Sequence, residues 1–158
     1  MMYLNKLFTI NQLRENLKKI NESNLTVGFT NGCFDLLHDG HKSLLSHAKQ
    51  KCDFLIVGLN SDSSVKMLKG INRPIENEAV RLKNLSTIND VDALIVFKEK
   101  TPIKIIKEIM PNILFKGADY KFKEVIGSEI VIKNGGKIEF VDILEGFSTT
   151  NIIKNSSI

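Results

Sequence analysis

The fold is decided by one stretch, residues 25–59, which runs LTVGFTNGCFDLLHDGHKSLLSHAKQKCDFLIVGL. Leu25–Phe29 predicts a short strand, and Phe54–Leu59 is a continuous apolar run typical of a strand covered on both faces. Between them, residues 41–51 place apolar side chains inward at helical spacing and lysines outward. The stretch therefore predicts a strand, a helix and a second strand, the unit from which parallel sheets are built.

The same alternation extends over the rest of the chain. Before the stretch, Thr9 and Gln12 have the spacing of a capping box, at the start of an amphipathic helix predicted over residues 10–20. After the stretch we predict a polar loop and then helices at 77–85, from 102 to about 110, at 123–133 and at 148–155. Strands are predicted between these helices, at 93–97, 113–115 and 137–141. Thr101 is the predicted N-cap of the second helix with Pro102 as its first residue, and Asn134-Gly135-Gly136 ends the third helix. This order predicts an α/β fold, a doubly wound parallel sheet of about five strands with helices on both faces and right-handed connections. No linker interrupts the chain, so we expect residues 1–158 to form a single domain, with 1–24 as an N-terminal helical extension.

Composition places the chain among ordinary globular proteins. Hydrophobic residues make up 42% and charged residues 25% of its 158 residues, close to the average for soluble domains. No apolar run approaches the roughly 18 residues that a bilayer span needs, and residues 1–16 lack the apolar core of a secretory signal. Two cysteines, Cys33 and Cys52, make neither a disulfide framework nor a zinc ribbon and are interpreted as small buried apolar residues. We therefore expect a cytoplasmic protein with no membrane partner.

The positive charge of the chain is mild and scattered. The 22 Lys and Arg residues exceed the 18 Asp and Glu residues by four, and only Arg14, Arg73 and Arg81 are arginines. Nucleic-acid-binding proteins usually gather their basic residues on a patch or stripe, whereas most of the lysines here recur at helical spacing. We expect no nucleic-acid partner and assign some lysines to anionic small molecules.

Polar, small and charged residues follow four of the predicted strands. In a parallel sheet the carboxyl ends of the strands share one edge, and ligands bind there near the point where the strand order reverses. Four such segments agree on this edge: residues 30–41 after the first strand, Asn60-Ser61-Asp62 with Lys66 and Lys69 after the second, 116–120 after the fourth and 145–150 after the fifth. The sequence therefore predicts one ligand site at this edge of the sheet.

The most specific motif within these segments is His38-Asp39-Gly40-His41. Two histidines three residues apart at the opening of a helix lie on the same side of one turn. Their ring N–H groups and the unpaired backbone N–H groups of the helix start would converge on an anion, and Gly40 lets a phosphate approach the backbone. The alternatives are a pair of surface or capping histidines, or a metal site formed with Cys33, for which zinc would want three or four ligands.

The segment before the last predicted helix has two interpretations. Ser148 either caps that helix or forms a second phosphate-binding cluster with Thr149 and Thr150. Asp119, in the segment after the fourth strand, is either a turn former or a residue of the site.

The basic residues after the second strand also have two interpretations. Lys66 and Lys69 are either solvated or aimed at phosphates, and Gly70 with Arg73-Pro74 indicates a shaped loop around them. Arg81, in the middle of the next predicted helix, is either an ordinary surface residue or a phosphate ligand.

Taken together, these segments resemble the HxGH nucleotidyltransferases, and in detail the heptose 1-phosphate adenylyltransferases. The resemblance is carried by residues 30–41, Asn60-Ser61-Asp62 followed by Lys69-Gly70 and Arg73-Pro74, 116–120 and 146–153, and it covers about residues 4–154 in the same order. In many bacteria this domain is fused behind a sugar kinase, which 158 residues cannot hold. The resemblance therefore implies a stand-alone form with a separate heptose kinase in its pathway.

The resemblance also implies a reaction, a fold and a cofactor. D-glycero-D-manno-heptose 1-phosphate and ATP would give ADP-heptose and pyrophosphate, for lipopolysaccharide or surface-glycan synthesis. The family fold is a Rossmann-like α/β sheet, in agreement with the order of elements. Mg²⁺ would be carried by the ATP phosphates and water rather than by protein ligands alone, and a homodimer is the family expectation.

The roles that the resemblance implies fall into three groups. The catalytic residues are His38, His41 and Lys69. The nucleotide-binding residues are Asn31, Gly32, Cys33, Phe34, Gly40, His41, Arg81, Gly117, Asp119, Ser148, Thr149 and Thr150. The residues for the sugar phosphate are Asp35, Asn60, Asp62, Lys66, Lys69 and Arg73.

Two departures from the family pattern keep other functions open. Glycerol 3-phosphate cytidylyltransferases share the histidine motif and the Ser-Thr-Thr segment but carry an arginine just ahead of their Glu-Gly, where this chain has Ile143-Leu144. Ala118 stands where a second glycine is more usual. The alternatives are a cytidylyltransferase acting on glycerol 3-phosphate or another small phosphorylated alcohol, a non-catalytic nucleotide-binding domain, and a nucleic-acid-binding module.

Overall fold

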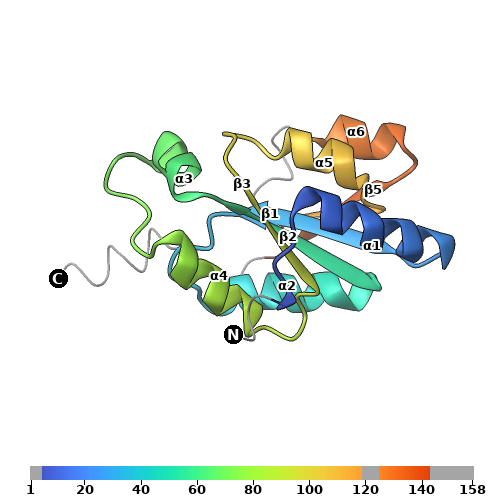
Figure 1. Ribbon diagram of the computed structural model, residues 1–158, viewed down its shortest axis with the longest axis horizontal. Helices are drawn as coiled ribbons and strands as arrows, with labels where there is room; N and C mark the ends of the chain where they lie inside the picture. The colour runs from blue at the N-terminus through green and yellow to red at the C-terminus, as the bar shows by residue number, and fades with distance from the viewer. Residues whose placement is uncertain (1–4, 119–124, 143–158) are drawn as a thin grey trace.

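The computed structural model describes residues 5–118 and 125–142, which contain one five-stranded sheet (Figure 1). Its strands are β1 (Val27–Gly32), β2 (Phe54–Asn60), β3 (Ala93–Phe97), β4 (Ile113–Gly117) and β5 (Lys137–Val141). They are all parallel and lie in the order β3-β2-β1-β4-β5. The order reverses at β1, so the chain enters at the centre of the sheet and extends it first to one side and then to the other. The predicted doubly wound parallel sheet is confirmed.

Helices cover both faces of the sheet. One apolar cluster holds side chains of α1 (Ile10–Glu22), α5 (Ile103–Ile109) and α6 (Ser128–Lys133), and the other holds side chains of α2 (Asp39–Lys51) and α4 (Glu78–Ser86). Figure 1 shows the first group above the sheet and the second below it. The two layers follow from the right-handed connections between parallel strands.

Strand β2 shows why the sheet is buried on both faces. Leu55, Val57 and Leu59 pack in the cluster of α2 and α4, whereas Ile56 packs in the cluster of α1 and α5. Because alternate side chains of a strand point to opposite faces, both faces need apolar residues. This is the physical reason for the continuous apolar run.

The N-terminal helix belongs to this core. The predicted capping box is present, because Gln12 N donates to Thr9 Oγ1 at 3.2 Å and Thr9 N donates to Gln12 Oε1 at 2.9 Å. Leu13 and Leu17 are 0% and 5% exposed within the first cluster. Residues 5–24 therefore contribute to the same core as the sheet.

The residues just before α1 run along an edge of the sheet. Phe8 N donates to Leu94 O at 2.9 Å, and Leu94 N donates to Lys6 O at 2.7 Å. Leu94 lies in β3, which is the edge strand of the sheet formed by the described residues. The N-terminal segment therefore satisfies backbone groups of this edge strand.

The structure corrects the predicted boundaries of several elements. The polar segment after β2 contains a helix, α3 (Asp62–Lys69), whose N-cap Ser61 accepts a hydrogen bond from Ser64 N at 3.2 Å. Short polar helices lack the apolar periodicity on which the prediction depended. Strand β1 continues to Gly32, so Asn31 and Gly32 lie in the strand rather than after it.

Two predicted helix starts are wrong. Helix α5 begins after Pro102, which makes no side-chain cap hydrogen bond, so Thr101 does not cap it. Helix α6 begins at Ser128 rather than at 123, since Gly127 takes a φ of 89° just before it. The stop at Asn134-Gly135-Gly136 is confirmed, whereas the helix predicted at 148–155 lies outside the described residues.

Candidate active site

The first turn of α2 follows β1 and carries both histidines of the motif. His41 N donates to His38 Nδ1, and His38 N donates to His41 Nδ1, each at 3.3 Å. This is a capping box built from two imidazoles, with His38 as the N-cap and His41 at the third helical position. The capping interpretation of the two histidines is therefore correct, and it is compatible with ligand binding because each ring has a second nitrogen.

The reciprocal caps fix where each ring carries its proton. A nitrogen that accepts a backbone N–H is unprotonated, so neutral His38 and His41 are Nε2–H donors. The two rings stack with their centroids 3.7 Å apart and their planes at 16°. The pair thus behaves as one rigid unit at the helix start.

Both histidines are held in the neutral state. Burial lowers the pKa of His41 to about 4, with further contributions from the charges of His38 and Lys69. Burial also lowers the pKa of His38, and the neighbouring Asp39 opposes this. At pH 7 the turn therefore offers neutral N–H donors beside the positive end of a helix.

The loop between β1 and this turn has a strained backbone. Phe34 and Leu36 have φ values of 48° and 55°, in the left-handed region that residues with side chains rarely adopt. Such residues cost on the order of 1–3 kcal/mol each and persist where surrounding contacts hold them. Phe34 is 6% exposed, and its ring centroid lies 5.1 Å from that of His41. The structure thus places Phe34 in the core as a support for His41.

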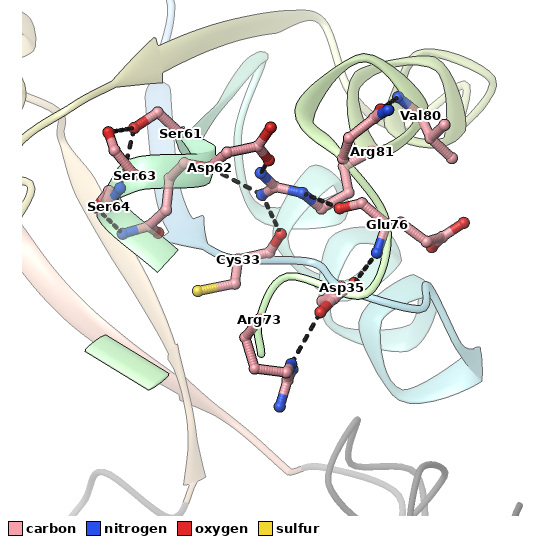
Figure 2. Close-up of polar contacts among 12 residues, drawn as sticks. Cys33, Asp35, Ser61, Asp62, Ser63, Ser64, Arg73, Glu76, Val80 and Arg81 are labelled. Atoms are coloured by element: carbon pink, nitrogen blue, oxygen red, sulfur yellow. Dashed lines mark hydrogen bonds and ion pairs between the residues drawn. The ribbon is translucent and has the colours of Figure 1, made fainter. Parts of the chain in front are cut away.

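Asp35 is the most heavily bonded residue of that loop. Its carboxylate accepts from Ile75 N at 2.7 Å. It also accepts from Glu76 N at 2.9 Å and from Arg73 Nε at 3.0 Å (Figure 2). Burial alone would raise the pKa of Asp35, but these hydrogen bonds outweigh it and hold the pKa below its ordinary value. Asp35 is 1% exposed, so the structure does not support the expectation that it contacts the sugar phosphate. It anchors the 73–76 loop instead.

Arg81, on α4, is the largest fully buried side chain among the described residues. Its Nε donates to Glu76 O at 3.0 Å, its Nη1 to Cys33 O and Asn60 O at 2.8 Å each, and its Nη2 to Asp62 Oδ1 at 2.8 Å (Figure 2). All three guanidinium nitrogens are therefore engaged with protein oxygens. This geometry does not support the expectation that Arg81 contacts a nucleotide phosphate.

Two residues at the junction of β2 and α3 bond to neighbouring side chains. Asn60 is 3% exposed, and its Nδ2 donates to Ser64 Oγ at 2.9 Å. Asp62 begins α3, and its half-exposed carboxylate pairs with the guanidinium of Arg81. Because Asn60 is buried and the carboxylate of Asp62 is held by Arg81, the structure does not support their assignment to the sugar phosphate.

Lys69 is brought toward the histidine turn. It is the last residue of α3, after which Gly70 turns the chain with a φ of 103° that favours glycine. Its charge contributes to the lowered pKa of His41, and it also opposes the rise that burial causes in the pKa of Cys33. Lys66, one turn earlier on the helix, is exposed like Lys69. The structure thus joins Lys69 electrostatically to His41 of the predicted catalytic pair.

Arg73 lies in the loop that follows α3, and its side chain is 14% exposed. Its Nε is bound by Asp35, but its buried Nη2 has no hydrogen-bond partner among residues 5–118 and 125–142. Because buried donors in folded proteins nearly always have acceptors, this nitrogen marks a position suited to an anionic oxygen.

The switch point between β1 and β4 holds Lys116, which the sequence analysis placed in the segment after the fourth strand without giving it a role. Lys116 Nζ donates to Asn31 Oδ1 at 2.5 Å, which joins the carboxyl ends of the two central strands. Burial lowers the pKa of Lys116 to about 8. A lysine inside an otherwise apolar strand segment was the available signal.

The remaining predicted site residues divide into two sets. Gly32 is in β1, Gly117 ends β4, and Gly40 is buried in the first turn of α2. Outside the described residues lie Asp119, Ser148, Thr149 and Thr150. Within residues 5–118 and 125–142, no three His, Cys, Asp or Glu side chains are grouped to hold a metal ion. No helix in these ranges has the length and apolarity needed to cross a membrane.

Comparison with known proteins decides the family. A family model described as cytidylyltransferase-like matches residues 29–155, which include the histidine turn and all five strands except the first two residues of β1. The chain belongs to the cytidylyltransferase-like family. The predicted resemblance to nucleotidyltransferases is thereby confirmed, as is the prediction that the chain is an enzyme of this type.

Relatives of this cytidylyltransferase-like chain include longer proteins. It is 49% identical over 144 residues to the bifunctional protein HldE of Nitrobacter winogradskyi and 53% identical over 129 residues to that of Caulobacter vibrioides. These matches cover 91% and 82% of the chain but 30% and 27% of the relatives. The chain therefore spans less than a third of the length of these relatives.

Solved structures agree on the cytidylyltransferase-like fold. The lipopolysaccharide core biosynthesis protein of Thermoplasma volcanium has a TM-score of 0.62 and 32% identity, covering 76% of this chain and 97% of that one. Pantoate-beta-alanine ligase of Francisella tularensis has a TM-score of 0.65, covering 94% of this chain and 72% of that one. At 19% identity the second likeness concerns the fold alone. The predicted Rossmann-like architecture is confirmed.

Proposed function

We propose that this domain transfers AMP from ATP to D-glycero-D-manno-heptose 1-phosphate, giving ADP-heptose and pyrophosphate. The observation that carries the proposal is the imidazole capping box after β1, which leaves neutral His41 with an Nε2–H donor beside Lys69. The identity of about half to HldE proteins over most of the chain supports the sugar phosphate as acceptor.

The reaction needs no general base from the protein. A phosphate monoester has a second pKa near 6, so its oxygen is already anionic at pH 7. That oxygen attacks the α-phosphorus of ATP in line, a new P–O bond forms, and the bond from the α-phosphorus to the bridging oxygen breaks as pyrophosphate leaves with the electron pair. The protein must position the two phosphates and stabilise the charge that develops on them.

The residues of the site divide this work. His38 and His41 donate Nε2–H groups to the ATP phosphates, and Lys69 neutralises charge on the same side. Asn31, Lys116 and the glycines of the strand ends shape the nucleotide pocket, and Ser148, Thr149, Thr150 and Asp119 complete it. The sugar phosphate is bound by Arg73 through its buried Nη2 and by Lys66, with Asp35 holding Arg73 in place.

A divalent metal fits this arrangement as part of the nucleotide. We propose that Mg²⁺ enters on the ATP phosphates with water as its other ligand. When bound, it neutralises phosphate charge.

The acceptor substrate points to a preceding reaction. A sugar 1-phosphate is one product that a sugar kinase can supply, and the relatives named HldE are bifunctional. We propose that a sugar kinase acts before this domain in the same pathway, that the product serves lipopolysaccharide or surface-glycan synthesis in the cytoplasm, and that the enzyme is a homodimer.

Pyrophosphate release tests the proposal. The purified protein with Mg²⁺ is given ATP or CTP, crossed with both anomers of heptose 1-phosphate and with glycerol 3-phosphate. Release with ATP and one heptose anomer is the expected result. Release with CTP and glycerol 3-phosphate would replace the proposal by a cytidylyltransferase, and ATP binding without release in any combination would reduce it to a nucleotide-binding domain.

A further inference from the structure

Arg81 joins three segments that are far apart in the sequence. Its acceptors are Cys33 O after β1, Asn60 O and Asp62 Oδ1 at the junction of β2 and α3, and Glu76 O in the loop before α4. Figure 2 shows its guanidinium between Asp62, the Cys33 carbonyl and Glu76. A buried cation is stable only where its donors and charge are satisfied, so the three segments and Arg81 hold one another.

The loop that Arg81 holds at its first residue is the strained one. Cys33 precedes Phe34 and Leu36, whose φ values are 48° and 55°. At the other end of this strained segment, Leu36 N donates to Glu76 Oε1 at 3.1 Å. Contacts from Arg81 and Glu76 therefore clamp the loop that leads into His38.

Glu76 is the second junction of this network. Its N–H donates to Asp35 and its carbonyl accepts from Arg81 Nε, while its carboxylate accepts from Leu36 N and, at 3.4 Å, from Asn84 Nδ2. All four of its polar groups are bound. The loop that carries Arg73 is thus fixed to the loop that carries the histidine turn.

The same guanidinium fixes α3. Asp62 is the first residue of this helix and Lys69 is its last. A helix of eight residues is a rigid spacer of about 12 Å, so an ion pair at its first residue restrains the position of the last. Arg81 therefore sets Lys69 and Arg73 relative to the histidine turn without touching a ligand.

We propose that Arg81 is a positioning residue, which holds the histidine turn, Lys69 and Arg73 in one geometry. Arginine suits this role because its planar fork reaches several acceptors in fixed directions, whereas the ammonium of lysine is a single point. The kinetic part of the inference depends on the proposed function.

Arg81→Lys tests the role of the fork while keeping the charge. In the folded variant we expect kcat for pyrophosphate release to fall ten- to hundredfold with KM for ATP within threefold, because misplaced groups lower the rate of an oriented reaction. Arg14→Lys is the matched control, since Arg14 also makes side-chain hydrogen bonds, to Glu108 and Asn11, but on an exposed surface; its kcat should stay within twofold. A kcat for Arg81→Lys within twofold of the original protein would overturn the proposal.

Chemical rescue separates positioning from general stability. In Arg81→Ala, added ethylguanidinium should raise kcat at least fivefold and leave the original protein unchanged. If Arg81→Ala or Arg81→Lys does not fold, Asp62→Asn carries the test, because it alters the carboxylate that pairs with Arg81 at a side chain that is 41% exposed. We expect its kcat to fall at least fivefold, and an unchanged kcat would overturn the proposal.

Hydrogen exchange tests the inference without any turnover. The amides of Leu36, Ile75 and Glu76 are bound by this network, and their exchange should speed up at least tenfold in Arg81→Lys or Asp62→Asn while amides of the far helix α1 keep their rates. Uniform acceleration, or none, would overturn the positioning role. If the original protein releases no pyrophosphate with any substrate pair, the proposed function fails, and this measurement still decides the inference.

Discussion

The histidine turn and Arg81 belong to one site but use their hydrogen-bonding groups differently. Each histidine gives one ring nitrogen to the helix cap, so neutral His41 retains an Nε2–H donor. Arg81 directs all three of its nitrogens to protein oxygens. The comparison teaches that residue type alone does not show which residues contact a ligand. A residue that keeps a hydrogen-bond donor for a ligand can contact it, whereas a residue whose donors all bind protein oxygens positions other residues.

The largest expected effect lies on the histidine side of this comparison. We expect His41→Ala to lower kcat by about 10²- to 10⁴-fold with the fold retained, because it removes a donor that acts on the transferred phosphate. Steady-state pyrophosphate release checks this. His47→Ala is the control: His47 lies on the same helix, is 40% exposed and faces Glu139 at 4.0 Å, so its loss should leave kcat within twofold. Turnover retained in folded His41→Ala would remove His41 from the mechanism.

The next effect concerns stability in acid. The pKa of His41 is about 4 in the folded protein, below its ordinary value of 6.5, so the unfolded chain binds a proton first as the pH falls. Stability is therefore full above pH 6.5 and decreases toward pH 4, by roughly 3 kcal/mol from this residue. Urea unfolding at pH 7 and pH 4.5 measures the loss. The decrease should shrink by about 2 kcal/mol in His41→Ala and persist in His47→Ala; equal decreases in both would show that His41 titrates normally.

Lys69 tests whether the exposed cation belongs with the histidines. We expect Lys69→Ala to lower kcat/KM by about 10- to 30-fold, since it removes one charge acting across a partly solvated distance. Lys104, which is 77% exposed and 3.8 Å from Glu99, supplies the control variant Lys104→Ala. Equal kinetics for the two variants would place Lys69 outside the site.

The smallest effect is expected at the exposed arginine. Arg14 pairs with Glu108 at 2.7 Å, with the two side chains 48% and 34% exposed. Such pairs contribute about 0–1 kcal/mol, so Arg14→Gln should change the free energy of unfolding by less than about 1 kcal/mol. Urea unfolding at low and high salt measures it. A larger loss would weaken the contrast between the exposed and the buried arginine.

The sequence predicted the fold better than the details of the site. Continuous apolar runs such as Phe54–Leu59 report burial on both faces, which is a property of a parallel sheet as a whole. Helix α3 was missed because its eight residues, DSSVKMLK, span only about two turns, too few to establish a period. The start of α5 depends on the backbone geometry at Pro102, and the presence of Thr101 and Pro102 in the sequence does not determine that geometry.

The predicted roles of the site residues depended on the type of each side chain, and hydrogen-bond partners elsewhere in the fold could change those roles. The pair His38 and His41 could be placed because both residues of the cap lie within one turn. The inward roles of Asp35 and Arg81 depend on partners such as Ile75, 40 residues from Asp35, and Cys33, 48 residues from Arg81, and spacing along the chain carries no information about them. Lys116 was given no role for the same reason, since its partner Asn31 lies 85 residues earlier.

The short pairing of residues 6–8 with Leu94 has a consequence for how the protein behaves in concentrated solution. An uncovered outer strand presents a row of N–H and C=O groups that can recruit a strand from another molecule. Here Lys6 O and Phe8 N occupy those groups of β3. The N-terminal segment therefore occupies the backbone groups of Leu94, and chains trimmed to begin at α1 would leave these groups open to intermolecular β-pairing.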